Sequence, residues 1–135
     1  MTWLDGRSGT STDIYAQKLN ATGAGQWTYN GVAVCEAAGE QDNARIVSNG
    51  SGGAFIVWDD ERDGTTDVNT YAQNIGSDGT PVWIADGEEI CGAAGNQTAV
   101  VISEDGAKGM FVAWADARGG TVKAYGHRVL SLIHI

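Results

Sequence analysis

The sequence is poor in basic residues and in long apolar runs, and each shortage excludes a class of protein. Lysine and arginine make up 8 of the 135 residues against 17 aspartate and glutamate, a formal net charge of −9. Eight scattered cations do not form the basic face that nucleic acids and anionic membranes require. No apolar run approaches the about 20 residues that span a bilayer. We therefore expect no nucleic-acid partner and no membrane insertion.

Proline is also scarce, while glycine and apolar residues are plentiful. There is 1 proline against 20 glycines, and no Gly-X-Y period indicates collagen. Hydrophobic residues make up 42%, which supplies a core and excludes a disordered chain. Glycine together with Val, Ile, Thr, Trp and Tyr is typical of short strands joined by tight turns. No stretch has a convincing helical period, so the sequence predicts an all-β fold.

The chain repeats itself, with matching segments 55 or 56 residues apart. The motif W-x-D-x-R-x-G occurs at residues 3–9, 58–64 and 114–120. The segment V-C-E-A-A-G-E-Q at 34–41 matches I-C-G-A-A-G-N-Q at 90–97. Chance does not produce this many matches in one register. The chain is therefore about two and a half copies of a unit of about 56 residues.

Each copy divides into four predicted strands. In the second copy they are residues 53–60, 67–75, 82–91 (interrupted by an Asp-Gly turn) and 98–103. The first is the most apolar and is expected to be buried on both faces. Four strands in a repeated unit of this length are the pattern of a β-propeller blade, whose first strand lines the central channel. A β-solenoid has shorter coils, and a β-sandwich does not need this fidelity of repetition.

We predict a β-propeller fragment of about 2.5 four-stranded antiparallel blades over residues 1–129. The repeat units are residues 3–57, 58–113 and 114–129, approximately. Residues 130–135 leave the repeat, and L-S-L-I-H-I is how a common transposon-end sequencing adapter reads when translated. The hypothesis is that this tail, with His134, is an artefact. A partial propeller leaves blade faces bare, so we expect it to be unstable or prone to aggregation alone.

The repeat resembles one found in large secreted bacterial proteins, whose tandem units have the form GGAIIAWxDxRxG…DIYAQ…GVAVC…IVSDGxGG. The matching residues are W-D-D-E-R at 58–62, T-Y-A-Q at 70–73, Trp83, Cys91 and V-I-S at 101–103. The resemblance covers residues 3–129. It implies propeller-like blades and an extracellular or cell-surface location, although no export signal occurs in the sequence. It implies no defined activity.

Repeated charged and aromatic residues are the candidate ligand-binding groups. The charged ones are spaced i, i+2 in each W-x-D-x-R motif, which places both side chains on one strand face: Asp5 and Arg7, Asp60 and Arg62, Asp116 and Arg118. They are interpreted as internal ion pairs or, alternatively, as a ring that holds a polar or anionic ligand at a channel mouth. The aromatic candidates are Trp27, Trp83, Tyr15 and Tyr71. They either pack between blades or stack on sugar rings.

Cysteine and histidine patterns favour neither a metal site nor catalysis. Cys35 and Cys91 hold equivalent positions without CxxC spacing, so we interpret them as buried thiols, with a disulfide or metal pair as the alternative. His127 stands where the other copies have Gln17 and Gln73. No G-x-S-x-G, H-E-x-x-H or phosphate-loop motif occurs. We expect no metal, no cofactor and no enzyme activity.

The sequence favours a non-catalytic structural or ligand-presenting segment of a secreted or cell-surface bacterial β-propeller protein. Its expected partners are a glycan or another extracellular ligand and the remaining blades of a parent chain. A carbohydrate-binding, lectin-like propeller is the alternative. A glycosidase-type propeller fragment is a third interpretation, because carboxylates abound, but no carboxylate pair breaks the repeat as a catalytic pair would.

Overall fold

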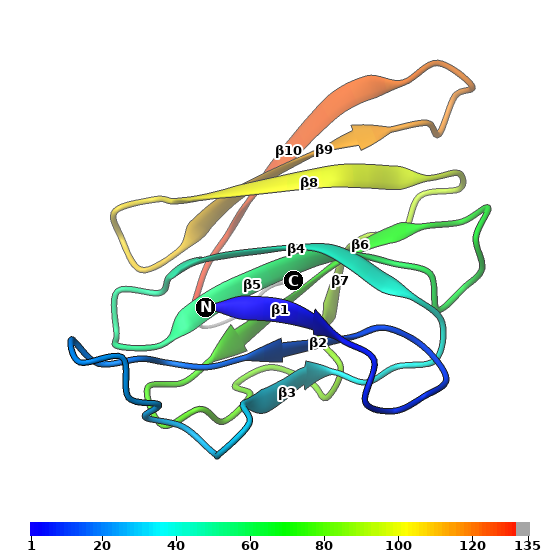
Figure 1. Cartoon of the computed structure of the whole chain (residues 1–135). Helices are drawn as coiled ribbons and strands as arrows, with labels where there is room; N and C mark the ends of the chain where they lie inside the picture. Colours follow the sequence, from blue (N-terminus) through cyan, green and yellow to red (C-terminus); the bar gives the residue numbers. More distant parts are fainter. Residues whose placement is uncertain (132–135) are drawn as a thin grey trace.

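A computed structural model describes residues 1–131, which form three antiparallel sheets (Figure 1). The first sheet has the order β1 (Thr2–Asp5), β2 (Asp13–Ala16), β3 (Val32–Cys35). The second has the order β4 (Gln41–Ser48), β5 (Ala54–Asp60), β6 (Asn69–Ile75), β7 (Glu88–Cys91). The third has the order β8 (Gln97–Glu104), β9 (Met110–Asp116), β10 (Lys123–Val129). The all-β prediction is confirmed. The described part of the chain contains no helix suited to crossing a membrane.

The predicted place of the most apolar strand is wrong. Residues 53–60 were expected to lie at the inner end of a blade, but β5 lies between β4 and β6 and is hydrogen-bonded to both. The fourth predicted strand of each copy opens the next sheet, since β8 pairs with β9. Periodicity along a strand identifies its faces but not its neighbours, so the sequence did not reveal this order. Each sheet is formed by consecutive strands of the chain. The predicted boundary between the first two repeat units, at residues 57 and 58, therefore falls within the second sheet and not between two sheets.

The segment predicted as a strand at residues 82–91 is a strand only in its second part, β7. Asp86 and Gly87 both have positive φ, 61° and 87°, which ends extended pairing before Glu88. The turn passes directly over Trp58. A Cβ on Gly87 would lie 2.5 Å from Cη2 of Trp58, so only glycine fits there.

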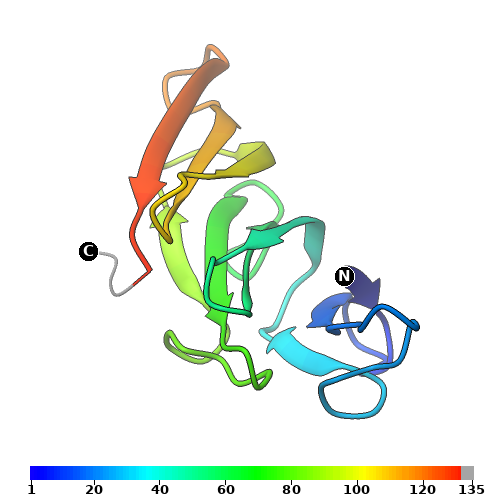
Figure 2. The ribbon, with the colours of Figure 1, turned by 90° about the vertical axis from the view of Figure 1, so that its left-hand side faces the viewer.

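The side chains of β5 alternate between two core layers. All seven residues of this strand are buried. Ile56 and Trp58 pack in a cluster with residues of the first sheet, whereas Phe55 and Val57 pack in a cluster with residues of the third. The predicted burial of both faces is therefore confirmed. Figure 2 shows the same order in space, with the second sheet between the other two.

Buried glutamines hold the linkers that connect consecutive sheets. Gln41 is fully buried, and its Nε2 donates to the carbonyl oxygens of Ala37 (3.1 Å) and Gly39 (2.8 Å). Its backbone N–H donates to the carbonyl of Thr12 in the preceding sheet, at 3.0 Å. Gln97 makes the same bonds in the next linker. This explains why glutamine ends the repeated C-x-A-A-G-x-Q segment.

Replacing Gly87 by alanine tests the turn over Trp58. The new Cβ would also lie 2.8 Å from the carbonyl oxygen of Ala72. We expect Gly87→Ala to lower the free energy of unfolding in urea by about 2–4 kcal/mol, through backbone strain and overpacking. Gly119→Ala is the control, because a Cβ at Gly119 meets nothing within 4 Å. Equal stabilities of the two variants would contradict this account of the turn.

Candidate functional site

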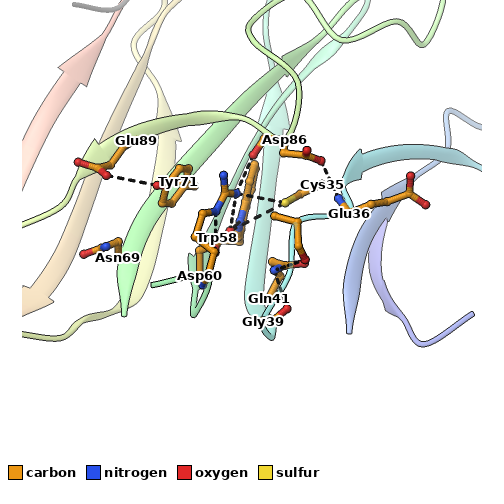
Figure 3. Close-up of polar contacts among 12 residues, drawn as sticks. Cys35, Glu36, Gly39, Gln41, Trp58, Asp60, Asn69, Tyr71, Asp86 and Glu89 are labelled. Atoms are coloured by element: carbon orange, nitrogen blue, oxygen red, sulfur yellow. Dashed lines mark hydrogen bonds and ion pairs between the residues drawn. The ribbon is translucent and has the colours of Figure 1, made fainter. Parts of the chain in front are cut away.

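The Asp–Arg pair of the second sheet is an internal, fully bonded unit. Asp60 is completely buried and accepts hydrogen bonds from Trp58 Nε1 at 2.7 Å and from Arg62 Nε at 2.9 Å. The backbone N–H of Arg62 also donates to this carboxylate, at 2.9 Å. Trp58 and Asp60 share a face because they are two residues apart on β5, whereas Arg62 lies in the turn after the strand, not on it as predicted, and reaches back to the carboxylate. Figure 3 shows Trp58 and Asp60 turned toward each other.

Arg62 joins that carboxylate to the neighbouring strands and to the first sheet. Its guanidinium lies 3.8 Å from the centre of the Tyr71 ring, a cation–π contact. Nη2 also donates to the carbonyl of Asp86 at 2.8 Å and to Sγ of Cys35 at 3.3 Å. Cys35 belongs to the first sheet, so this arginine connects two sheets. Burial raises the pKa of Tyr71 to about 12, which keeps its hydroxyl neutral.

The first sheet carries the same arrangement. Trp3 Nε1 donates to Asp5 at 2.9 Å, Arg7 forms an ion pair with Asp5, and the guanidinium lies 3.9 Å from the Tyr15 ring centre. Arg7 Nη2 donates to the carbonyl of Asn30 at 3.0 Å, as Arg62 does to Asp86. Its hydrogen bond holds the pKa of Asp5 well below the ordinary value.

The third sheet repeats it again. Asp116 accepts from Trp114 Nε1 at 3.0 Å and from Arg118 Nε at 2.9 Å. Arg118 lies 4.2 Å from the Tyr125 ring centre and donates to Sγ of Cys91 at 3.2 Å. The arginine hydrogen bond holds the pKa of Asp116 well below its usual range. Every predicted pair is thus bonded to its own tryptophan and tyrosine, the geometry of an internal strut. The side chains of Arg7 (41%) and Arg118 (38%) retain exposed surface, more than Arg62 (20%).

The predicted aromatic residues take part in packing. Trp27 Nε1 donates to the carbonyl of Ser77 in the second sheet's turn at 3.0 Å, and a Cβ on Gly79 would lie 2.7 Å from its ring. The Trp83 ring centre lies 5.7 Å from that of Phe55. Tyr15 and Tyr71 each stack on the tryptophan of their own sheet, with ring centres 6.3 Å apart.

A hollow of about 770 Å³ lies beside the first sheet. Its lining residues combine aromatic, aliphatic and polar groups: Trp3, Arg7, Gln17, Leu19, Gly25, Trp27, Tyr29, Asn30 and Gly31. Arg7 and Trp27 are the predicted candidates among them. Tyr29, 89% exposed, was not predicted, although a signal existed: the equivalent residue of the next copy is Ala85. A residue that leaves the repeat is not required by the shared fold.

The two cysteines are free thiols and differ in exposure. Cys35 is buried as predicted, and burial raises its pKa to about 12, so it is a neutral, unreactive thiol. Cys91 is only partly buried, which corrects the prediction for that residue. Arg118, which contacts Sγ of Cys91, is itself more exposed (38%) than Arg62 (20%), which contacts Cys35.

Asp59 is a buried carboxylate that the sequence interpretation missed. It is 4% exposed and accepts from Asn43 Nδ2 at 2.7 Å and from the backbone N–H of Ala99 at 3.0 Å. It therefore connects the second sheet to β8 of the third. The equivalent residues are Leu4 and Ala115, so a break in the repeat marks this position. Burial raises the pKa of Asp59 above its ordinary value.

Residues 1–131 contain no cluster of three or more His, Cys, Asp or Glu side chains placed to hold a metal ion. His127 lies exposed on β10, and His134 lies outside the described residues. Comparison with family models, with curated proteins and with solved structures finds no match.

Asparagine substitutions at Asp60 and Asp5 remove the same Asp–Arg ion pair from two sheets in which the arginine is buried to different extents. Asp60→Asn leaves the mostly buried Arg62 without its counter-charge, so we expect a loss of about 3 kcal/mol or more in the free energy of unfolding. Asp5→Asn removes the same type of ion pair where Arg7 is more exposed, and we expect a smaller loss. Urea unfolding of both variants measures the difference. A larger loss at Asp5 would contradict the assignment of Asp60 as the stronger strut.

The raised pKa of Asp59 predicts a specific pH dependence. The unfolded chain ionises this carboxyl near its ordinary pKa of 3.8, before the folded protein does. The contribution of Asp59 to stability therefore falls as pH rises from below that value through the folded pKa. We expect the stability of Asp59→Asn relative to wild type to increase from pH 4 to pH 7, measured by urea unfolding at each pH. Glu104→Gln, at an exposed carboxylate that is not among the charges acting on Asp59, is the control. A pH-independent difference at Asp59 would contradict the prediction.

Proposed function

We propose that this chain is a non-catalytic structural or ligand-presenting segment of a secreted or cell-surface bacterial β-propeller protein. The observation that carries the proposal is that the Asp and Arg side chains of the W-x-D-x-R motif bond to neighbouring residues of the fold. The carboxylates of Asp60 and Asp116 are buried and bonded to Trp and Arg in an arrangement repeated sheet after sheet. Groups that are repeated, buried and fully bonded support packing rather than chemistry. The resemblance to repeats of secreted bacterial proteins supports the location.

The propeller part of the proposal is supported by the order of the sheets. The second sheet stacks between the first and the third, and β4, at one edge of its sheet, lies against β8, at the corresponding edge of the next (Figure 2). Edge strands that meet in this way are typical of blades arranged around an axis. The inner strand is then the fourth predicted segment of each copy rather than the first. Further copies of the repeat are the proposed neighbours.

Tandem arrays of residues 36–91, which contain one linker and one complete sheet, test this proposal. An open array gains stability by a constant increment per added copy, because each copy contacts only its neighbours. A propeller closes at one copy number, where its end faces cover each other. We expect thermal unfolding of arrays of four to nine copies to show one length with an abrupt rise in midpoint. A smooth dependence on copy number would contradict closure.

A lectin-like role is the second candidate, favoured by the hollow beside the first sheet. Trp3, Trp27 and Tyr29 line it together with polar groups of Arg7 and Gln17. Aromatic faces beside hydrogen-bonding groups suit the apolar faces and hydroxyls of a sugar ring.

A glycan array tests this candidate with wild type and Tyr29→Ala. Ala85 at the equivalent position indicates that alanine preserves the fold. If the hollow binds sugar, we expect Tyr29→Ala to lose that binding without a change in the thermal midpoint of unfolding. The control Ile84→Ala, at another exposed residue, is expected to bind as the wild type does. Absence of glycan binding by the wild type, or binding that Tyr29→Ala leaves intact, would reject the hollow as a sugar site.

A further inference from the structure

The two outer faces of the three-sheet stack carry exposed residues whose repeat equivalents are buried between the sheets. On the outer face of the third sheet, Phe111 is 51% exposed, while its equivalent in the second sheet, Phe55, is fully buried against the third sheet. Val101, 55% exposed, lies on the same face, because it pairs with Ala113, two residues from Phe111 along β9. The outer face of the third sheet is thus equivalent to the face of the second sheet that packs against the third.

The first sheet presents the opposite type of face. Leu19 is 46% exposed, while its equivalent, Ile75, is fully buried in the cluster between the first and second sheets. Met1, 61% exposed, is the equivalent of Ile56, also fully buried in that cluster. Trp3, on the same face, is the equivalent of Trp58. The outer face of the first sheet is thus equivalent to the face of the second sheet that packs against the first.

We propose that a second copy of this chain docks head to tail, with the third sheet of one copy packing on the first sheet of the next. The contact would continue the interfaces already present between the first and second and between the second and third sheets. It joins two different surfaces, so it is heterologous, and each added copy again presents both faces. The copies then form an open chain, or a ring of two or more copies where the rotation between them closes. The inference rests on the sheet-to-sheet contacts and holds whether or not tandem arrays close into a propeller.

Single lysine substitutions at each face test the proposal by complementation. Phe111→Lys places an unpaired charge on the third-sheet face, and Leu19→Lys places one on the first-sheet face. Each variant keeps the other face intact. The matched control is Val122→Lys, an apolar residue 67% exposed in the turn between β9 and β10. All these positions are exposed, so folding is expected to survive, which circular dichroism verifies.

Sedimentation velocity at about 0.15 M salt, where exposed charges are screened beyond about 8 Å, measures the association. We expect the average mass of wild type and Val122→Lys to rise with concentration to two chains or more. Phe111→Lys and Leu19→Lys alone associate at least about tenfold more weakly, because a buried unpaired charge is costly. Their equimolar mixture forms a species of two chains and stops there, since both remaining faces carry the lysine.

Three results would overturn the proposal. The first is a wild type that stays monomeric at every concentration. The second is a dimer that persists in Phe111→Lys or in Leu19→Lys alone, because every head-to-tail contact in such a dimer would contain a lysine. The third is a mixture of the two lysine variants that remains monomeric, because head-to-tail docking requires their intact faces to meet. Val101→Lys, on the same face as Phe111, provides an independent variant and is expected to replace Phe111→Lys in each experiment.

Discussion

The buried ion pair at the end of β5 is the interaction on which the stacking of the sheets depends. Its aspartate, Asp60, accepts hydrogen bonds from Trp58 on the same strand and from Arg62 in the following turn, and Arg62 also donates to Cys35 of the preceding sheet. A carboxylate removed from water is stable only when its partners replace the lost hydration, and here they do. The same solution recurs at Asp116, where Arg118 reaches Cys91. Each sheet is thereby oriented on its predecessor by directional bonds, whereas the apolar contacts between them supply attraction without direction.

The apolar core has a matching arrangement. A strand such as β5, with buried residues on both faces, serves two interfaces at once. Trp58 shows how closely the two systems are joined, because its ring packs in one core layer while its Nε1 holds the carboxylate. The turn at Gly87 then covers the ring at a distance that only glycine permits. Substitutions at this point affect packing, backbone conformation and electrostatics together.

Much of the fold could be predicted from the sequence, because repetition multiplies weak signals. Four segments per copy, the two-sided burial of β5 and the pairing of Asp60 with Arg62 all follow from local patterns. The pairing of β8 with β9 could not be predicted, since alternation does not identify a strand's partner. The contact of Arg62 with Cys35 joins residues of different sheets and has no local pattern. Asp59 and Tyr29 were detectable only as departures from the repeat, a signal that says where to look but not what the residue does.

The continuity of each sheet in sequence has a consequence for folding during synthesis. The second sheet occupies residues 41–91 without contributions from later segments, and the third begins at Gln97. A ribosome therefore delivers one complete sheet before the next one starts. The face formed by Phe55 and Val57 remains uncovered only until the following strands emerge. At about 5–20 residues per second that interval is on the order of seconds, so each nascent sheet is exposed to wrong partners only briefly.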